Sequence, residues 1–394
     1  MQHKLIRLCC SIAVALAAAS ADAQPALKIG LIMPYSGQFA DTATQMDNAI
    51  KLYVKQKGDT VAGRKIEFIR KDTGGVAPDV AKRLAQELVV RDQVDLLAGF
   101  VLTPNALAVS DVSAEAKKFM VIMNAATSII TTRSPYSVRT SVTLPQLNET
   151  FGTWAYKSGL RKVYTMVSDF GPGHDSETSF HRGFKDAGGE IVGSVRFPLA
   201  NPDFSAFVQR AKDVNPEGIY IFVPGGVQPV AIGKALSERG IDPKKIKILG
   251  MGELTEDEAR KSMGDASLGI MTVYHYDWNH NSALNREFVK AFNAEYGGRN
   301  PNIYSIGGYD GMHLIYEALK KTGGKTDGDS LVAAAKGMSW ESPRGPISID
   351  PETRDIIQTA YIRRVDKVGG QLVNVEFDKV ENVKDPVKAR MKPR

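Results

Sequence analysis

The sequence predicts an α/β protein of two lobes, each a doubly wound parallel β-sheet with helices on both faces, joined by a hinge of several strands. The chain has 394 residues, which is long for one domain and suits two lobes. Apolar, strand-like runs alternate with helix-like periodic runs, and after a pause the alternation starts again. A last group of helices and strands follows the second set, so the chain must cross between the lobes more than once.

Composition and charge are those of an ordinary folded protein. Hydrophobic residues make up 43% of the chain and charged residues 24%, which excludes the disordered and fibrous classes. The formal net charge is +6, and the basic residues are scattered rather than clustered. This mild excess suits an exported protein that meets small anions, and we expect no nucleic-acid partner.

Residues 1–23 have the three-part layout of a secretory signal peptide. Lys4 and Arg7 precede an apolar run at 8–19, and a small-x-small pattern ends at Ala23. The run is shorter than the ~20 residues that a membrane span needs. We expect cleavage near Ala23 and export to the periplasm.

Both cysteines, Cys9 and Cys10, lie inside this leader. A lipid-modified cysteine would have to stand at the cleavage end, so the pattern does not indicate a lipoprotein. The mature chain is then expected to contain neither a disulfide nor a cysteine nucleophile. Its stability must come from burial of an apolar core.

The first folded unit is a strand that leads into a helix through a tight polar loop. Residues 28–33 form a short apolar run, and turn-forming residues at 34–37 break it before the periodic run 41–57. Ser36 and Gly37 are placed where the first backbone N–H groups of the helix lack partners, which attracts an anion. We therefore expect this loop to form half of a binding cleft.

Further strands and helices complete the first set and indicate a parallel sheet. The predicted strands are 65–70, 94–100 and 119–123, and the predicted helices are 79–90 and 106–117. Loops that follow parallel strands gather at one edge of the sheet, where ligands bind. The candidate wall consists of the loops 34–39, 72–75, 100–105 and 124–128.

The second set follows a pause at 137–144. It contains the predicted strands 162–168, 190–197, 218–223, 246–250 and 270–276, and the predicted helices 145–158, 176–187, 203–214, 227–239 and 255–263. Its loop 169–174 is rich in glycine, which permits close backbone approach, and Phe170 adds an apolar face. Ligand contact and a plain strand-to-helix turn explain this loop equally well.

The last part of the chain is expected to return to lobe 1 and then to the hinge. Helical stretches at 282–296, 304–321 and 329–336 bring no strand partners, whereas 347–349, 357–365 and 371–378 have the pattern of antiparallel strands. We assign 27–143 and 277–345 to lobe 1, and 144–276 and 346–394 to lobe 2. The Lys/Arg-rich tail after Val383 is predicted to be a solvated end.

The chain contains no catalytic signature. Neither a Gly-x-Ser-x-Gly elbow nor a His-Glu-x-x-His helix occurs, and Gly324-Lys325-Thr326 matches only the end of a phosphate loop. His275, Asp277 and His280 are metal ligands by type, but we favour a strand end that enters a linker. We expect no catalytic residue, no cofactor and no metal.

Five groups of residues follow one another in a characteristic order. They are 28–37, Asp72 with Pro78 and Ala81, Val94 and Asp95 ahead of Gly99, 169–173, and 202–205. Together they resemble the leucine/isoleucine/valine-type periplasmic solute-binding proteins of ABC transporters, which are type I periplasmic binding proteins. The resemblance covers nearly the whole mature chain.

This resemblance implies a clamp with a three-strand hinge that closes on a small solute and presents it to an ABC permease in the inner membrane. In such proteins a hydroxyl residue four positions after the glycine that ends the third strand, and a small-residue loop after the fourth, hold the ligand's carboxylate. The matching residues here are Thr103 and the loop of Asn124, Ala125, Ala126 and Thr127. Donors that converge on a carboxylate give short, charge-assisted hydrogen bonds.

The resemblance also makes the opening loop a wall that contacts the ligand's apolar part. Tyr35, Ser36 and Phe39 belong to this wall, and Phe170 and Gly171 face it from lobe 2. Phe170 stands where many members have tyrosine, and this removes a hydroxyl that could help to recognise an ammonium group.

The identity of the carboxylate ligand stays open. Glu253 matches an acidic residue that amino-acid-binding members place near the ligand's amino group, so a branched-chain or other apolar amino acid is our first expectation. The aromatic residues Tyr35, Phe39, Phe100 and Phe170 also suit a benzoate-like or phenylpropanoid acid, which needs no acidic partner. A periplasmic ligand sensor is a further alternative, and we expect a monomer.

Overall fold

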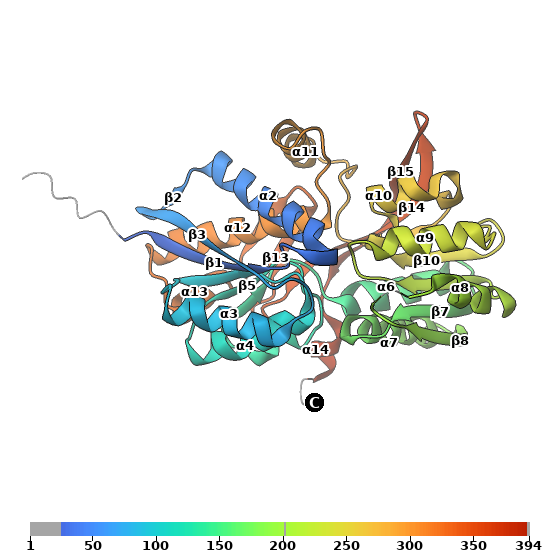
Figure 1. Cartoon of the computed structure of the whole chain (residues 1–394), viewed down its shortest axis with the longest axis horizontal. Coiled ribbons are helices and arrows are strands. Elements are labelled where there is room, and N and C mark those ends of the chain that lie inside the picture. The colour runs from blue at the N-terminus through green and yellow to red at the C-terminus, as the bar shows by residue number, and fades with distance from the viewer. Residues whose placement is uncertain (1–24, 201, 392–394) are drawn as a thin grey trace, which may run out of the picture.

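The computed structural model describes residues 25–200 and 202–391. It has two lobes, each built on a β-sheet, that lie side by side along the long axis of the molecule (Figure 1). The predicted α/β architecture is therefore present. The predicted signal peptide, residues 1–23, lies outside the described residues. Within the described residues, no helix has the length and apolar character that a membrane span requires.

Lobe 1 is built on a six-stranded sheet in the order β2-β3-β1-β4-β5-β6. The strands are β1 (Leu27–Met33), β2 (Thr60–Val61), β3 (Arg64–Asp72), β4 (Leu96–Gly99), β5 (Met120–Ile122) and β6 (Ser137–Arg139). The apolar strand β1 is buried in the middle, and it pairs in parallel with β3 on one side and β4 on the other. Because the strands from β3 to β6 are parallel, their carboxyl ends lie at the same edge of the sheet.

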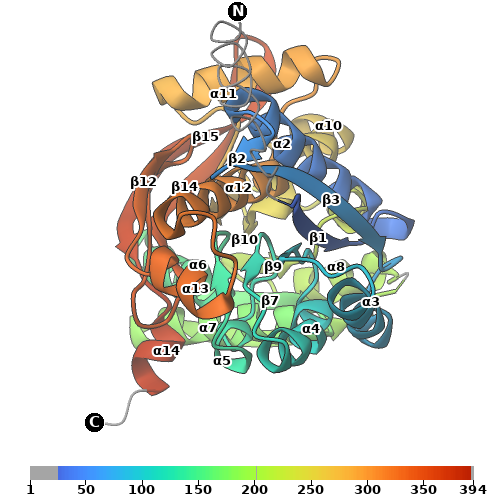
Figure 2. The same ribbon diagram turned by 90° about the vertical axis from the view of Figure 1, so that its left-hand side faces the viewer.

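Helices cover both faces of this sheet, because a parallel connection needs a crossover. Those from the first part of the chain are α2 (Ala40–Lys57), α3 (Pro78–Val90), α4 (Thr103–Glu115) and α5 (Ile130–Arg133). Three later helices return to lobe 1 as expected, namely α11 (Ala283–Glu295), α12 (Ile303–Thr322) and α13 (Gly328–Ala335). Helix α12 packs along α2, as the end-on view in Figure 2 shows.

Lobe 2 is built on a nine-stranded sheet. Its strands are β7 (Lys162–Ser168), β8 (Glu190–Phe197), β9 (Gly218–Phe222), β10 (Lys247–Met251), β11 (Met271–Tyr274), β12 (Ser339–Ser342), β13 (Gly345–Ile349), β14 (Ile356–Val368) and β15 (Gln371–Val383). The strands β8, β7, β9, β10 and β11 run in parallel, and β14 joins β11 in the antiparallel sense. The parallel part therefore repeats the plan of lobe 1.

The helices of lobe 2 lie on both faces of its parallel strands. They are α6 (Leu144–Lys157), α7 (Gly171–Asp186), α8 (Phe204–Asp213), α9 (Gln228–Glu238) and α10 (Asp257–Met263). Helices α6 and α7 approach closely because Gly152 and Gly183 face the partner backbone. A Cβ atom on Gly152 would lie 2.7 Å from the backbone nitrogen of Phe184.

Within the described residues the chain passes between the lobes after β6, after β11 and after α13. Strand β12 pairs with β13, and β13 pairs with β14, so this ladder joins residues on both sides of the sequence-derived boundary at 345. The described residues also include three short 3₁₀ turns. They are η1 (Gly37–Phe39), η2 (Gly252–Thr255) and η3 (Gly264–Ser267).

Three short strands were not predicted: the two-residue strand β2, which pairs with β3, and the strands β6 and β12. The pause expected at 137–144 contains β6, a three-residue strand whose Ser137 and Arg139 are buried polar residues. Strand β12 is similarly short and holds one apolar residue, Trp340. In β6 and β12 the backbone pairs with a neighbouring strand although the side-chain pattern carries no apolar run.

Candidate ligand-binding site

A cavity lies between the loops at the carboxyl ends of the two sheets. It encloses about 510 Å³ of space that protein atoms do not fill, part of it open to solvent. From lobe 1 and the segment that enters α6 it is lined by Phe39, Thr42, Val101, Leu102, Thr103, Asn124, Ala126, Leu144 and Tyr304. From lobe 2 it is lined by Phe170, Pro172, Phe222, Pro224, Gly225, Glu253 and Tyr274.

Aromatic side chains form most of the walls. Phe39 ends the η1 turn, Phe222 ends β9 and Tyr274 ends β11, while Phe170 precedes α7 and Tyr304 lies in the first turn of α12. The Phe170 and Phe222 rings are 6.3 Å apart at an angle of 33°. Such surfaces bury a flat apolar group well, since aromatic faces supply large contact areas.

Thr103 provides a hydroxyl at the lobe 1 side of the cavity. It is the first residue of α4, its side chain is 4% exposed, and its Oγ1 has no hydrogen-bond partner. The start of α4 also presents backbone N–H groups that the helix itself does not use. This corner can therefore donate hydrogen bonds to an anionic group.

Asn124 borders the same corner, where it supports the loop after β4. Its Nδ2 donates a 2.8 Å hydrogen bond to the carbonyl oxygen of Val101. The side chain thereby connects the loop after β5 to the loop that contains Thr103. The loops after β4 and β5, which were predicted to belong to one wall, therefore lie together.

Glu253 provides a carboxyl group at the lobe 2 side. It lies in the η2 turn and is 7% exposed. Its Oε1 accepts a 2.8 Å hydrogen bond from the Tyr274 hydroxyl, whereas Oε2 is buried without a partner. Burial raises the pKa of Glu253 to about 7, although its own backbone N–H, the Tyr274 hydrogen bond and the positive charge of Arg363 oppose this rise.

A wider groove borders the cavity and leads to solvent. Glu256, Trp278 and Arg299 are among its lining residues. Gly225 and Tyr304 line both the cavity and the groove. Their contact therefore separates the inner cavity from the outer groove.

Two residues of the predicted wall, Tyr35 and Ser36, do not line the cavity. The Tyr35 hydroxyl is buried near Asp47 and Arg70, and burial raises the pKa of this hydroxyl. Ser36 is exposed, and its backbone N–H donates to the Asp72 carboxylate at 3.3 Å. The anion expected at this turn is thus a side chain of the protein itself.

Asp72 is well suited to that role. Its Oδ1 also accepts a 2.8 Å hydrogen bond from the backbone N–H of Gly74. Partial burial would raise the pKa of Asp72, but the hydrogen bonds from Ser36 and Gly74 outweigh it and lower the pKa. The carboxylate stays ionised and fixes the opening loop.

Phe100 and Ala125 lie in the core of lobe 1 instead of the cavity. Each is 1% exposed, and both belong to an apolar cluster with residues of α3 and α4. Phe100 has a φ of 65°, an uncommon conformation for a residue with a side chain. This conformation directs its ring into the core, while the residues after it continue to the cavity.

Thr127 and Gly171 lie beside the cavity without lining it. Thr127 is buried, and its carbonyl oxygen accepts a 2.7 Å hydrogen bond from Arg139. Its Oγ1 forms no close, well-aligned hydrogen bond. The Thr127 hydroxyl is close enough to Asp175 of α7 to act on that carboxyl, whose pKa burial raises. Gly171 is exposed at the start of α7.

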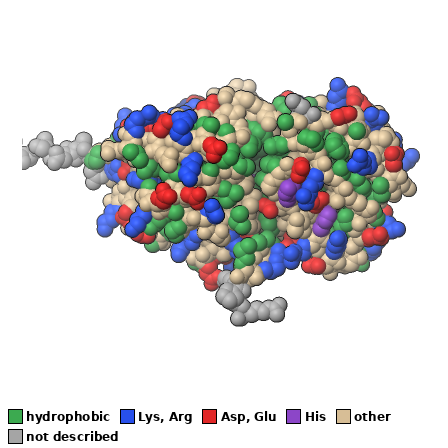
Figure 3. Space-filling model, turned by 60° about the horizontal axis from the view of Figure 1, so that its bottom comes forward, with side chains coloured by type: hydrophobic (Ala, Val, Ile, Leu, Met, Phe, Trp, Pro, Cys, Tyr) green, Lys and Arg blue, Asp and Glu red, His purple; other side chains and the backbone are tan. Residues whose placement is uncertain are grey.

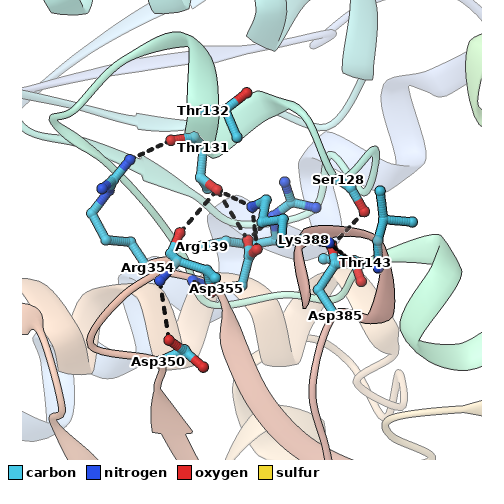
Figure 4. A network of polar contacts seen from close by, with 12 residues as sticks. Ser128, Thr131, Thr132, Arg139, Thr143, Asp350, Arg354, Asp355, Asp385 and Lys388 are labelled. Carbon is cyan, nitrogen blue, oxygen red and sulfur yellow. Dashed lines mark hydrogen bonds and ion pairs between the residues drawn. The ribbon is translucent and has the colours of Figure 1, made fainter. Parts of the chain in front are cut away.

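The segment that follows Thr127 is held by the end of the chain (Figure 4). Ser128 donates a hydrogen bond to Asp385, and Lys388 donates to Thr131 and to Asp355. Lys388 lies in α14 (Pro386–Met391) and is buried. The prediction of a solvated tail is therefore wrong, because alternating Lys and Arg residues can also supply partners for buried carboxylates.

Several cavity residues were not found from the sequence. Phe222 and Tyr274 end parallel strands, so the rule that ligands bind beyond carboxyl ends could have found them. Tyr304 lies in a helix, where periodicity alone does not say which neighbouring lobe the side chain meets. Gly225 carries no signal in a single sequence.

Of the residues considered for metal binding, Asp277 and His280 have other partners, and both ring nitrogens of His275 are buried without a hydrogen-bond partner. Asp277 accepts a 2.9 Å hydrogen bond from Arg363, and His280 Nδ1 lies 2.8 Å from Glu376. His275 is fully buried, and burial lowers its pKa. Within residues 25–200 and 202–391, no three His, Cys, Asp or Glu side chains form a group suited to a metal ion.

Charges on the surface are mixed. On the face shown in Figure 3, basic and acidic side chains alternate over both lobes, with hydrophobic side chains between them. This face carries no extended patch of one sign. The scattered basic residues of the sequence remain scattered there.

The model of the family described as periplasmic binding protein matches residues 26–371. The chain belongs to the periplasmic binding protein family. Leu/Ile/Val-binding protein homolog 6 of Brucella melitensis biotype 1 is 42% identical over 380 residues, which are 95% of this chain and 97% of that protein. The family resemblance stated from the sequence is confirmed.

Solved periplasmic binding proteins share the fold closely. A solute-binding protein of an ABC transporter from Rhodopseudomonas palustris BisB5, in complex with 3,4-dihydroxybenzoic acid, is 55% identical. The match covers 92% of this chain and 99% of that one, with a TM-score of 0.89. A second, from R. palustris HaA2 in complex with p-hydroxybenzoic acid, is 40% identical, with coverage of 93% and 100% and the same TM-score.

A leucine-binding protein from Thermotoga maritima is 22% identical with a TM-score of 0.79, covers 90% of this chain and 99% of that chain, and shares the fold alone. The family model and the 55% identical solute-binding protein both match most of the present chain, so it is the solute-binding component of an ABC transporter. A small-molecule ligand and a permease are its partners. The family is periplasmic.

Proposed function

We propose that this periplasmic binding protein captures an aromatic carboxylate of the benzoate type and delivers it to its permease. The observation that carries the proposal is the set of five aromatic side chains around the cavity between the lobes. A flat ring fits between such walls, while a branched aliphatic side chain gains less from them. The hydroxybenzoate complexes of the Rhodopseudomonas palustris proteins support the same ligand class.

The carboxylate is proposed to bind at the lobe 1 corner. Thr103 offers a hydroxyl that has no partner, and the start of α4 offers backbone N–H groups. A carboxylate there gains charge-assisted hydrogen bonds and the favourable end of the helix dipole. The ring then lies between Phe39 and Phe170, and the residues of lobe 2 close over it.

A branched-chain or other apolar amino acid is the second candidate. The curated relatives' names favour it, and Glu253 could pair with an ammonium group. The proposed test of that role is Glu253→Gln, which removes the charge and keeps the shape. An amino-acid ligand should lose affinity because it loses its counter-charge, and an aromatic acid should keep its affinity within about threefold.

Isothermal titration and thermal unfolding with six ligands test the proposal. The ligands are benzoate, 4-hydroxybenzoate, 3,4-dihydroxybenzoate, leucine, isoleucine and valine. At a hundredfold excess over its dissociation constant, the true ligand should stabilise the protein by about 2.7 kcal/mol. Stabilisation by the amino acids and by none of the aromatic acids would overturn the proposal.

We further propose closure of lobe 1 (27–143 and 277–345) onto lobe 2 (144–276 and 346–394) as the capture step, in a monomer that does not bind nucleic acid. Small-angle scattering should give a smaller radius of gyration with ligand than without it. The protein is proposed to carry out no chemistry, with neither a cofactor nor a metal. Ligand recovered after denaturation should therefore be unchanged.

We also propose that residues 1–23 are removed on export, so that the mature chain begins after Ala23. Mass spectrometry of protein recovered from the periplasm should give the mass of a chain that begins at Gln24. A retained leader in that fraction would contradict this.

A further inference from the structure

We propose that the Glu253–Tyr274 pair recognises a hydroxyl group on the ligand's ring, so that the cavity selects hydroxylated benzoates over benzoate itself. The inference rests on the proposed function, because it needs an aromatic acid in the cavity. It assigns to Glu253 a role other than the partner of an ammonium group.

The pair is built by neighbouring strands of the lobe 2 sheet. Strand β10 leads into the η2 turn that carries Glu253, and the parallel strand β11 ends at Tyr274. Gly252 allows the two to meet, since a Cβ atom there would lie 2.5 Å from the Tyr274 ring. Both side chains are buried, and both line the cavity.

The hydrogen bonds of this pair are incomplete. Tyr274 donates its hydroxyl proton to Oε1 of Glu253 at 2.8 Å, and Oε2 has no partner. A buried polar atom without a partner is costly, so a ligand that supplies one gains affinity over a ligand that does not. Unsubstituted benzoate has no group for this purpose at the ring end opposite its carboxylate.

The protonation states of Glu253 favour a hydroxyl group over an ammonium group as its partner. Arg363 is a cation whose charge acts on Glu253, and it is already hydrogen-bonded to Asp277 at 2.9 Å. Because burial raises the pKa of Glu253 to about 7, both protonation states are populated near neutral pH. A phenolic hydroxyl can donate to the carboxylate or accept from the carboxylic acid, whereas an ammonium group can only donate.

The test compares dissociation constants of benzoate, 3-hydroxybenzoate, 4-hydroxybenzoate and 4-methoxybenzoate in the full-length mature protein. The better of the two hydroxybenzoates should bind at least tenfold more tightly than benzoate. At pH 8, where Glu253 is mostly ionised, the methoxy compound cannot donate to the carboxylate and should bind no more tightly than benzoate. These comparisons use the unchanged protein, so they hold even if a variant fails to fold.

Two variants of Glu253 and one control variant then locate the effect. Glu253→Met keeps the length of the side chain and removes both oxygens, and the ratio of benzoate to hydroxybenzoate dissociation constants should fall to within threefold of one. Glu253→Gln keeps an acceptor and a donor, and the ratio should stay above threefold. Phe39→Leu, on the opposite wall, should weaken both ligands and leave the ratio unchanged.

The outcomes separate this inference from the proposed function. If benzoate and the hydroxybenzoates bind the unchanged protein equally well, the hydroxyl inference is wrong and the proposed function stands. If the ratio of benzoate to hydroxybenzoate dissociation constants is unchanged in Glu253→Met, the Glu253–Tyr274 pair does not recognise the hydroxyl group. If no aromatic acid binds at all, the proposed function fails and this inference fails with it.

Discussion

Gly225 of lobe 2 and Tyr304 of lobe 1 touch across the cavity. A Cβ atom on Gly225 would lie 2.8 Å from Cζ of Tyr304 and closer still to its hydroxyl oxygen. The next residue, Gly226, similarly meets the carbonyl oxygen of Gln38 in η1. The loop after β9 therefore closes against lobe 1 only because these two positions lack side chains.

Gly225→Ala should hinder this closure. The added methyl group would overlap Tyr304, so the closed form is destabilised relative to the open form and ligand affinity falls by about tenfold or more. Isothermal titration measures the affinity, and unfolding without ligand should change little. Gly171→Ala is the matched control, because a Cβ atom on Gly171 would meet nothing within 4 Å. Equal affinities of both variants would contradict the closure argument.

Thr103→Val should separate affinity from stability. The change removes a buried hydroxyl that has no partner and keeps the shape of the side chain. Affinity for a carboxylate ligand should fall by about tenfold, since a hydrogen bond to a charged group is worth about 1.5–3 kcal/mol. The free energy of unfolding without ligand should be unchanged or higher. Thr103→Ser keeps the hydroxyl donor and should bind the ligand as the unchanged protein does. If Thr103→Val also binds normally, Thr103 does not belong to the carboxylate site.

Glu253 should make stability fall as the pH rises. Its pKa in the folded protein is about 7, above the ordinary value of 4.5, so the folded state holds a proton that the unfolded state releases. The stability is fully present below about pH 4.5 and is lost as the pH rises through about 7. A shift of this size is worth about 3 kcal/mol. Urea unfolding at pH 4.5 and 8 should show that loss in the unchanged protein relative to Glu253→Gln, and parallel pH profiles would refute it.

Lys388→Met should destabilise the fold. Lys388 is buried against Asp355, and its loss leaves that buried carboxylate with the ion pair to Arg139 at 3.2 Å and the hydroxyl of Thr131. Breaking a buried ion pair costs about 3–5 kcal/mol, of which Arg139 should offset part. Lys384→Met is the control, because Lys384 is 63% exposed and its ion pair with Asp350 should contribute less than about 1 kcal/mol. Equal urea midpoints of the two variants would show that α14 contributes little to stability.

The sequence was sufficient for most of the architecture because its apolar periods are strong. The strand that became β1 and the helices that became α12 and α13 were predicted within one or two residues. Strand β6 was missed because Ser137 and Arg139 are polar residues buried by tertiary contacts. Helix α14 was missed because its basic residues pair with carboxylates that are distant in the sequence: Arg390 pairs with Glu149, and Lys388 pairs with Asp355 just before β14.

The sequence predicted which loops form the candidate site, but not which side chains of those loops face the cavity. Successive residues at a strand end point to opposite sides, so the identity of the loop does not say which aromatic ring faces the cavity. Phe39 and Phe170 line the cavity, whereas Phe100 turns into the core through its positive φ. Tyr274 and Tyr304 were missed because their orientation depends on how the lobes meet.

The contact between Ser128 and Asp385 joins residues that are 257 positions apart. In a chain made from its N-terminus, the segment after β5 emerges long before α14. Lobe 1 can assemble its sheet before these contacts exist, because Ser128 and Thr131 acquire Asp385 and Lys388 as partners only after β15 has been made. The segment beside the cavity is therefore completed by a part of the chain that is made much later, and a chain truncated before Asp385 would lack these contacts.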